Sequence, residues 1–336
     1  EGPLDLVRLR IAFGRVVERH AALRTTVDTD DGALVQRVRD YDGIDLPLVV
    51  AVGIDETSVI RGVLADLAGP FDLAGGSLLR ARIVRLAPDR HLVLLLVHQL
   101  VFDSFSAQVL LRDLAAFYRG DGLPALATDY PSYALSRIAE PARRAGDLAY
   151  WRRILADATP LRLPTDRPRP AVADLAGAAL VHDLDAGLGE SVAAFSRQHR
   201  VTPFMTLVAA VGAVLGRFAG QQDLVLGTAL SNRPAGTEDL IGLFADPVPL
   251  RLDLSGEPTL AELAARVRET TIDAVDHLAV GFDELVAELN PVRDPGRNPV
   301  FQVLVEYEST AELPFEPPAL RAGLTDVPGD RAPFDL

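Results

Sequence analysis

The side chains best suited to chemistry in this sequence lie in residues 98–104, which read His-Gln-Leu-Val-Phe-Asp-Ser. An apolar, strand-like run ends here and a helical pattern begins, so side chains can point into a cleft and the first helical amides favour an anion. A histidine side chain can accept a proton near neutral pH, whereas a glutamine amide such as that of Gln99 does not titrate there and only forms hydrogen bonds. Taken alone, a histidine at a strand end is more often structural than catalytic, so this stretch does not by itself assign a reaction.

Composition excludes several other chemistries. The chain of 336 residues has no cysteine and no lysine, which excludes thiolate nucleophiles, disulfides and lysine Schiff bases and favours a cytoplasmic location. Its six histidines lack the spacing of a helical zinc motif, so we expect no metal site. A formal net charge of −14 repels nucleic acid and anionic membranes. The longest apolar run, Leu92–Val97, is only of strand length, so we expect no membrane span.

Two strands and a helix are predicted to position residues 98–104. The strands run over Leu79–Leu86 and His91–His98 and are joined by a turn at Pro88-Asp89. The helix follows at once, with a buried stripe at helical spacing that consists of Ala107, Leu110, Leu111, Leu114 and Phe117. Elsewhere we predict helices over 6–17, 56–67, around 150–153, from the cap Thr202 and from the capping box at Thr259, and strands over 34–38, 46–52, 223–228 and 298–307. This alternation indicates a mixed α/β (α+β) fold.

A proline-rich stretch divides the pattern into two halves. Leu163–Pro170 contains three prolines within seven residues, which is typical of a stiff linker. We therefore expect an N-terminal lobe over residues 1–162, a linker over 163–172 and a C-terminal lobe over 173–336.

Residues 98–104 resemble the His-His-x-x-x-Asp-Gly signature of the condensation domains of nonribosomal peptide synthetases, which belong to the chloramphenicol acetyltransferase-like superfamily. Other stretches are similar to family blocks in the same order along the chain. They are Arg19–Thr25, Tyr150-Trp151, Thr202–Leu215, Val225–Thr228, Ile241–Phe244 with Pro249–Arg251, Phe282–Leu289 and Asn298–Gln302. The resemblance implies two chloramphenicol acetyltransferase-like lobes in a V with a tunnel between them. It also implies that the first lobe is truncated at its start and the second at its end.

This resemblance implies a transferase that forms amide bonds. In the family, an amine on an acceptor carrier attacks the thioester of an acyl or peptidyl group on a donor carrier. The expected partners are therefore donor and acceptor peptidyl carrier proteins and the neighbouring domains of a synthetase that makes an antibiotic or another secondary metabolite. The substrates are carried on the phosphopantetheine of those partners, and we expect no cofactor bound directly to this domain.

The signature departs from the family at its central position. The resemblance places Gln99 where the family has its catalytic histidine, and it matches His98 to the preceding, structural histidine. Ser104 stands in place of the signature glycine. Asp103 keeps the signature aspartate, which by resemblance forms a buried ion pair with Arg24 and fixes the loop. The catalytic set of His98, Gln99 and Asp103 therefore lacks the usual base.

Three further residues are candidates for the lining of the expected tunnel, namely Ser104, Ser231 and Asp246. The family commonly reads Val-Asn-Thr where this chain reads Ala245-Asp246-Pro247. Two interpretations of Asp246 are open: a turn residue before Pro247, or a tunnel carboxylate that contacts the acceptor amine.

Three functions are consistent with this sequence. The first is a condensation domain whose activity is impaired or altered because Gln99 replaces the base. General acid–base catalysis contributes about 10²–10⁴ in rate, which sets the scale of the expected loss. The second is a catalytically inactive, condensation-like domain that acts as a binding and recruitment platform. The third is a standalone acyltransferase of the same superfamily that uses a soluble thioester, which the later blocks and the long linker favour less.

Overall fold

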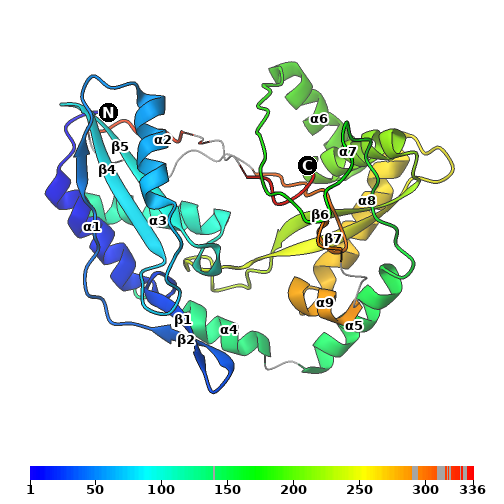
Figure 1. Ribbon diagram of the computed structural model, residues 1–336, viewed down its shortest axis with the longest axis horizontal. Coiled ribbons are helices and arrows are strands. Elements are labelled where there is room, and N and C mark those ends of the chain that lie inside the picture. Colours follow the sequence, from blue (N-terminus) through cyan, green and yellow to red (C-terminus); the bar gives the residue numbers. More distant parts are fainter. Residues whose placement is uncertain are drawn as a thin grey trace. The chain divides into compact units, whose positions relative to one another are not determined.

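The structure is a computed structural model and describes residues 1–138, 141–289, 294–308, 315, 317, 319–325, 327 and 331–336 (Figure 1). Its α-helices are α1 (Leu6–Arg19), α2 (Glu56–Leu67), α3 (Ser104–Arg119), α4 (Tyr130–Ile138), α5 (Pro141–Ile154), α6 (Ala186–His199), α7 (Pro203–Ala219), α8 (Leu260–Asp276) and α9 (Phe282–Leu289). Its strands are β1 (Thr25–Asp30), β2 (Ala33–Val38), β3 (Leu48–Val50), β4 (Leu79–Ala87), β5 (Arg90–Val97), β6 (Asp223–Ser231) and β7 (Ala245–Asp253). Short 3₁₀ helices are η1 (Ala21–Arg24) and η2 (Gln99–Val101).

The chain forms two compact units that exchange segments. Unit 1 comprises Glu1–Ala139, Arg233–Phe244 and Thr310–Thr325, and unit 2 comprises Glu140–Asn232, Ala245–Ser309 and Asp326–Leu336. This division differs from the predicted boundary at 163–172, which is irregular as predicted but lies within unit 2. The reason is that the preceding helix, α5, already packs Trp151 and Leu155 into the core of unit 2.

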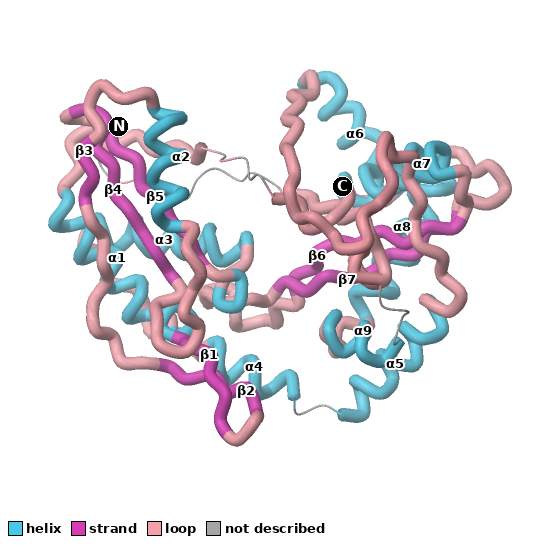
Figure 2. The backbone as a smooth tube through the Cα atoms, viewed as in Figure 1, coloured by secondary structure: helices cyan, strands magenta, loops and turns pink. Residues whose placement is uncertain are grey.

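Unit 1 contains a sheet in the order β3-β4-β5 that has helices on both faces (Figure 2). β4 pairs parallel with β3 and antiparallel with β5. Because side chains alternate along a strand, Ala81 and Ile83 of β4 join the core formed with α1 and α3, whereas Val84 and Leu86 pack with α2. Burial on both faces fits the apolar run Leu92–Val97 of β5, whereas β4 carries three arginines between its apolar residues. The same sheet fixes the point at which β5 ends and the signature begins.

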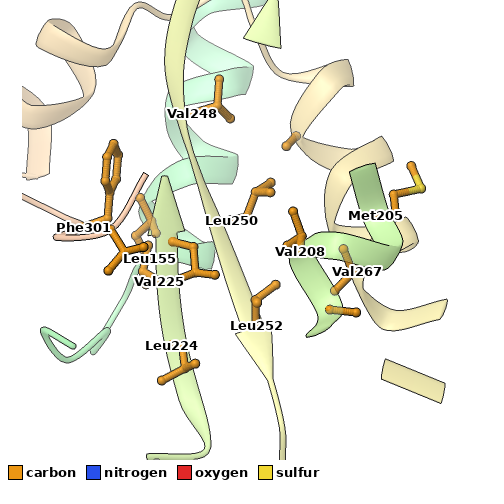
Figure 3. Packing of buried hydrophobic residues seen from close by; sticks show 14 of the residues in the cluster. Leu155, Met205, Val208, Leu224, Val225, Val248, Leu250, Leu252, Val267 and Phe301 are labelled. Atoms are coloured by element: carbon orange, nitrogen blue, oxygen red, sulfur yellow. The ribbon is translucent and has the colours of Figure 1, made fainter. Parts of the chain in front are cut away.

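Unit 2 is centred on the antiparallel pair β6–β7, against which α7 and α8 pack. Figure 3 shows Leu250 and Leu252 of β7 beside Val208 of α7 and Val267 of α8, and all four side chains are buried.

Of the described residues, no single helix is long and apolar enough to cross a membrane, and α6 with α7 meets that criterion only as a pair bent by 103°.

The late segment 298–307 does not form the regular strand that was predicted. Val300 has a φ of 66°, and the N–H of Phe301 donates to the carbonyl of Pro299 at 2.8 Å, which turns the chain tightly. Pairing with β6 begins beyond this turn, as an isolated parallel bridge between Gly227 and Leu304. The buried ring of Phe301 lies directly on Gly227, where a Cβ atom would come within 2.1 Å of it.

One connection belongs to a different unit from the strands it joins. Residues Arg233–Phe244, here called the β6–β7 connection, link two strands of unit 2 but belong to unit 1. Within unit 1 the hydroxyl of Tyr130 donates to the carbonyl of Leu243 at 2.8 Å. Burial raises the pKa of that Tyr130 hydroxyl to about 12, so it remains a donor. The connection thus brings residues distant in sequence to the signature.

Candidate functional site

The turn after β5 fixes the imidazole of His98. The backbone N–H of His98 donates to the carbonyl of Leu78 at 2.9 Å, which keeps the residue in register with β4. Its Nδ1 accepts a hydrogen bond from the N–H of Leu100 at 3.2 Å and so caps η2. A neutral imidazole has one acceptor nitrogen, so this bond places the ring proton on Nε2. The basic nitrogen of His98 is therefore occupied within the fold.

Gln99 lies on the outer side of the same turn. It begins η2 and is exposed, whereas His98 is half-buried and Val101 is buried. The carbonyl of Gln99 accepts a hydrogen bond from the N–H of Phe102 at 3.3 Å, which closes the turn. The turn thus presents a carboxamide, which takes up no proton near neutral pH, at the position predicted to be catalytic.

Asp103 joins this turn to α3 and to the β6–β7 connection. As the N-cap of α3, its Oδ1 accepts hydrogen bonds from the N–H and the hydroxyl of Ser106, at 2.8 and 2.7 Å. Its Oδ2 accepts a hydrogen bond from the N–H of Phe244 at 2.9 Å. Arg233 completes the set, with its guanidinium 3.3 Å from Oδ1. These bonds engage both carboxylate oxygens inside unit 1, so the geometry supports a structural role for Asp103.

The predicted ion pair between Arg24 and Asp103 does not form among the residues that the structure describes, so that prediction is wrong. Arg24 instead donates hydrogen bonds to the carbonyls of Val17 and Arg39, and so ties η1 to its neighbours. The physical reason is that Arg233 reaches Asp103 from the β6–β7 connection and supplies the opposite charge.

Arg233 is a site residue that the sequence prediction did not include. Its guanidinium lies between two rings, 3.7 Å from the centre of Phe244 and 4.4 Å from that of Phe105. It also donates hydrogen bonds to the carbonyls of Thr237 and Leu240, each at 2.8 Å. Burial lowers the pKa of Arg233, and the Asp103 carboxylate opposes that shift. The available signal was an arginine placed two residues after a buried strand and before the Ile-Gly-x-Phe block.

The remaining candidates are divided between the units. Ser104 is the exposed first residue of α3 in unit 1. Ser231 is exposed at the end of β6, and Asp246 lies on β7 opposite Leu230, both in unit 2. Asp246 is therefore a strand residue and not a turn residue, because β7 already begins at Ala245. Unit 1 thus brings together residues 98–104, and the tunnel roles of Ser231 and Asp246 stay predictions.

A cluster of charged side chains around the buried Asp113 supports the site from the end of α1. Nε2 of His20 and Nε of Arg19 lie 2.9 and 3.0 Å from Oδ2 of Asp113, and Arg112 donates to Oδ1 at 2.8 Å. Burial lowers the pKa of His20, although the Asp113 carboxylate acts against this shift. Arg112 also donates to Asp239 at 2.6 Å, so the cluster holds the β6–β7 connection at a second point. In the part of the chain that the structure describes, there is no group of three His, Asp or Glu side chains that could hold a metal ion.

The comparison with protein families decides to which family the chain belongs. A family model described as "Condensation domain" matches residues 1–336. The chain belongs to the condensation-domain family. This finding confirms the family that the signature and its ordered blocks predicted.

Relatives of this condensation domain include peptide synthetases. It is 38% identical over 351 residues to CymA, a probable nonribosomal peptide synthetase of Salinispora arenicola, and 33% identical over 340 residues to tyrocidine synthase 3 of Brevibacillus parabrevis. Both alignments cover 100% of this chain but span only 4% and 5% of those relatives. Among solved structures, the X-domain from teicoplanin biosynthesis is 31% identical with a TM-score of 0.84, over 99% of this chain and 77% of that chain. The mixed helix-and-sheet fold is thus confirmed.

Proposed function

We propose that this condensation domain joins a carrier-bound acyl or peptidyl thioester to a carrier-bound amine, and does so slowly because Gln99 supplies no base. The observation that carries the proposal is the hydrogen bond from Leu100 to Nδ1 of His98. It removes the nearest histidine as a substitute, since His98 would have to break that bond before it could accept a proton. The proposed partners are donor and acceptor peptidyl carrier proteins, whose phosphopantetheine holds the substrates, and neighbouring synthetase domains.

The reaction requires one proton to be moved and one oxyanion to be held. The acceptor nitrogen bonds to the thioester carbon, the C–S bond breaks, and the proton lost by the amine balances the one that the departing thiolate gains. The Gln99 carboxamide can accept a hydrogen bond from the amine or donate one to the oxyanion. Water takes up the amine proton in our proposal, so the domain contributes mainly orientation.

Restoring the signature tests this proposal. The Gln99→His variant and the unaltered chain are compared with the same loaded donor and acceptor carriers, and the amide product is detected by mass. We expect a gain in turnover of about 10² or more. Gln36→His is the matched control, because it makes the same exchange at an exposed position of β2, outside residues 98–104, and should bring no gain. Equal turnover of the unaltered chain and Gln99→His would contradict the proposal.

A recruitment platform is the second candidate function, and one comparison favours it. The teicoplanin X-domain has also been solved in a complex with OxyB, and in that structure it is 30% identical to this chain with a TM-score of 0.83. A domain without a base can still bind a carrier-bound peptide and present it to a second protein. No gain from Gln99→His, with carrier binding retained, would favour this function. A product formed from a soluble thioester alone would instead indicate a standalone acyltransferase.

A further inference from the structure

The imidazole of His98 is held from a second side by Phe71. The two rings meet edge to face, with centroids 5.4 Å apart and planes at 89°, an arrangement typical of favourable aromatic pairs. Phe71 is half-buried in the core of unit 1 with Val97 and Leu100, the neighbours of the signature turn. The ring of His98 is therefore held by its aromatic contact with Phe71 as well as by the hydrogen bond at Nδ1.

Phe71 is itself fixed by Arg80. The guanidinium carbon of Arg80 lies 4.1 Å from the centre of the Phe71 ring, within the range of a cation–π contact. The same guanidinium donates hydrogen bonds to the carbonyls of Leu67, Gly69 and Pro70, at 2.6, 2.5 and 2.7 Å. The Leu67 carbonyl belongs to the last turn of α2, and the other two belong to the chain that follows the helix, so Arg80 fixes the chain just before Phe71.

The pairing of β4 with β5 fixes the position of Arg80, and so of Phe71, relative to His98. Arg80 of β4 is paired with Leu96 of β5, two residues before His98. The torsion that turns an imidazole about its last bond is broad, so one hydrogen bond at Nδ1 leaves the ring mobile. A second contact, made by Phe71 and held in place by Arg80 of the neighbouring strand β4, restricts that rotation.

We propose that Phe71, held by Arg80, is a positioning residue that keeps Nδ1 of His98 on the Leu100 amide and thereby fixes the turn that carries position 99. Phe71 acts through His98 and does not contact the reacting groups. The inference rests on the proposed function only in taking position 99 as the reacting position.

Nuclear magnetic resonance of the histidine ring nitrogens tests this inference without any turnover. In the unaltered 336-residue chain at about pH 8, where an ordinary histidine is neutral, we expect His98 to carry its proton on Nε2. Phe71→Leu should shift the His98 signals towards a mixture of the two tautomers, and Phe71→Tyr should restore them. Phe117→Leu is the matched control, because Phe117 also packs in the core of unit 1 below an arginine, Arg15, and its loss should leave His98 unchanged.

Two results would overturn the inference. One is an unchanged His98 spectrum in Phe71→Leu, and the other is the same change in Phe117→Leu. Circular dichroism checks that each variant is folded, and Phe71→Met, which keeps bulk without a ring, replaces Phe71→Leu if that variant does not fold.

A second measurement separates this inference from the proposed function. In a Gln99→His background, adding Phe71→Leu should lower kcat by about tenfold or more with KM unchanged, and Phe71→Tyr should recover it. If Gln99→His alone brings no gain, the proposed function fails, and the spectrum of His98 then decides the inference. If the gain appears but Phe71→Leu leaves kcat unchanged, the positioning role is contradicted.

Discussion

Arg233 and Asp103 form a buried ion pair, with side chains 6% and 3% exposed. Removing one partner of such a pair leaves the other charge buried, which costs about 3–5 kcal/mol. We expect Arg233→Ala to lower the free energy of unfolding by that amount. Arg24→Ala should cost about 1–2 kcal/mol, because Arg24 donates to the carbonyls of Val17 and Arg39. Denaturant unfolding measures both, and a larger loss for Arg24→Ala would contradict the observed pairing.

The identity of this partner is a residue-scale detail that the sequence could not supply. The signature predicted that Asp103 needs a buried cation, and the structure provides one. Arg233 lies 130 residues further along the chain, and only the path of the β6–β7 connection brings it to the turn. Gln99 and His98, by contrast, are adjacent in sequence, and their shared turn could be placed at the end of a strand from the apolar pattern alone.

Protonation of His20 makes the stability of unit 1 depend on pH. Burial lowers the pKa of His20 below 6.5, so the unfolded chain binds this proton at a higher pH than the folded chain. The neutral His20 therefore contributes fully to the stability of the fold above about pH 6.5, and this contribution is lost as the pH falls towards the lowered pKa of the folded state. Asp113 stays ionised here: burial acts to raise its pKa, but His20 and Arg112 lower it below 3.8.

Thermal unfolding between about pH 7.5 and about pH 5 tests this dependence. The His20→Gln variant, whose amide can still donate to Asp113, should show a flatter dependence of Tm on pH than the unaltered chain. His91→Gln is the control and should change the slope less, because His91 is only half-buried. An equally steep slope in His20→Gln would refute the role of His20.

At the scale of elements, the C-terminal ends of α6 and α7 allow two opposite substitutions to be compared at the same kind of helix cap. Both C-caps are left-handed: Arg200 has φ 55° and ψ 42°, and Gly220 has φ 64° and ψ 27°. A residue with a Cβ atom is strained in this region and glycine is not. We expect Arg200→Gly to raise the free energy of unfolding by about 0.5–1 kcal/mol and Gly220→Ala to lower it by a similar amount. Chemical denaturation measures both changes, and a destabilised Arg200→Gly would contradict the cap geometry.

Local signals predicted several elements well. The helix expected over 56–67 is α2 with the same ends, and the caps at Thr202 and Thr259 begin α7 and α8 as predicted. Segment 298–307 was mispredicted because its β-branched pattern does not reveal that Phe301 must fit onto Gly227. That contact requires the turn at Val300, and it depends on a strand far away in the sequence.

At the scale of the whole molecule, two close approaches allow the units to be perturbed one at a time. A Cβ atom at Gly242 would lie 2.1 Å from the ring of Tyr130 in unit 1, and one at Gly227 would lie 2.1 Å from Phe301 in unit 2. Overpacking in either alanine variant should lower the free energy of unfolding by about 1–3 kcal/mol. The single tryptophan, Trp151, is buried in unit 2 and reports on that unit alone.

We therefore expect Gly242→Ala to separate two unfolding transitions. Circular dichroism should show an earlier loss of structure, while the fluorescence of Trp151 changes at the denaturant concentration of the unaltered chain. Gly227→Ala should instead move the fluorescence transition to lower denaturant. Coincident transitions in both variants would show that the units unfold together.

The division into units could not be read from the linker. The prolines of 163–170 predicted irregular chain correctly, but a boundary depends on which core each helix joins. Trp151 and Leu155 commit α5 to unit 2 before the prolines are reached. The family blocks, which match from Arg19 to Gln302, predicted the fold class more reliably than any single linker signal.

The pH dependence of single-turnover amide formation tests most directly the claim that this site lacks a base. The carriers are loaded identically, and the rates of the unaltered chain and of Gln99→His are compared from about pH 5.5 to about pH 8.5, a range that includes the ordinary histidine pKa. We predict that Gln99→His is faster by about 10² or more at high pH and that this advantage disappears as its imidazole becomes protonated. Equal rates for the two chains at every pH, with efficient product formation by the unaltered chain, would contradict the account.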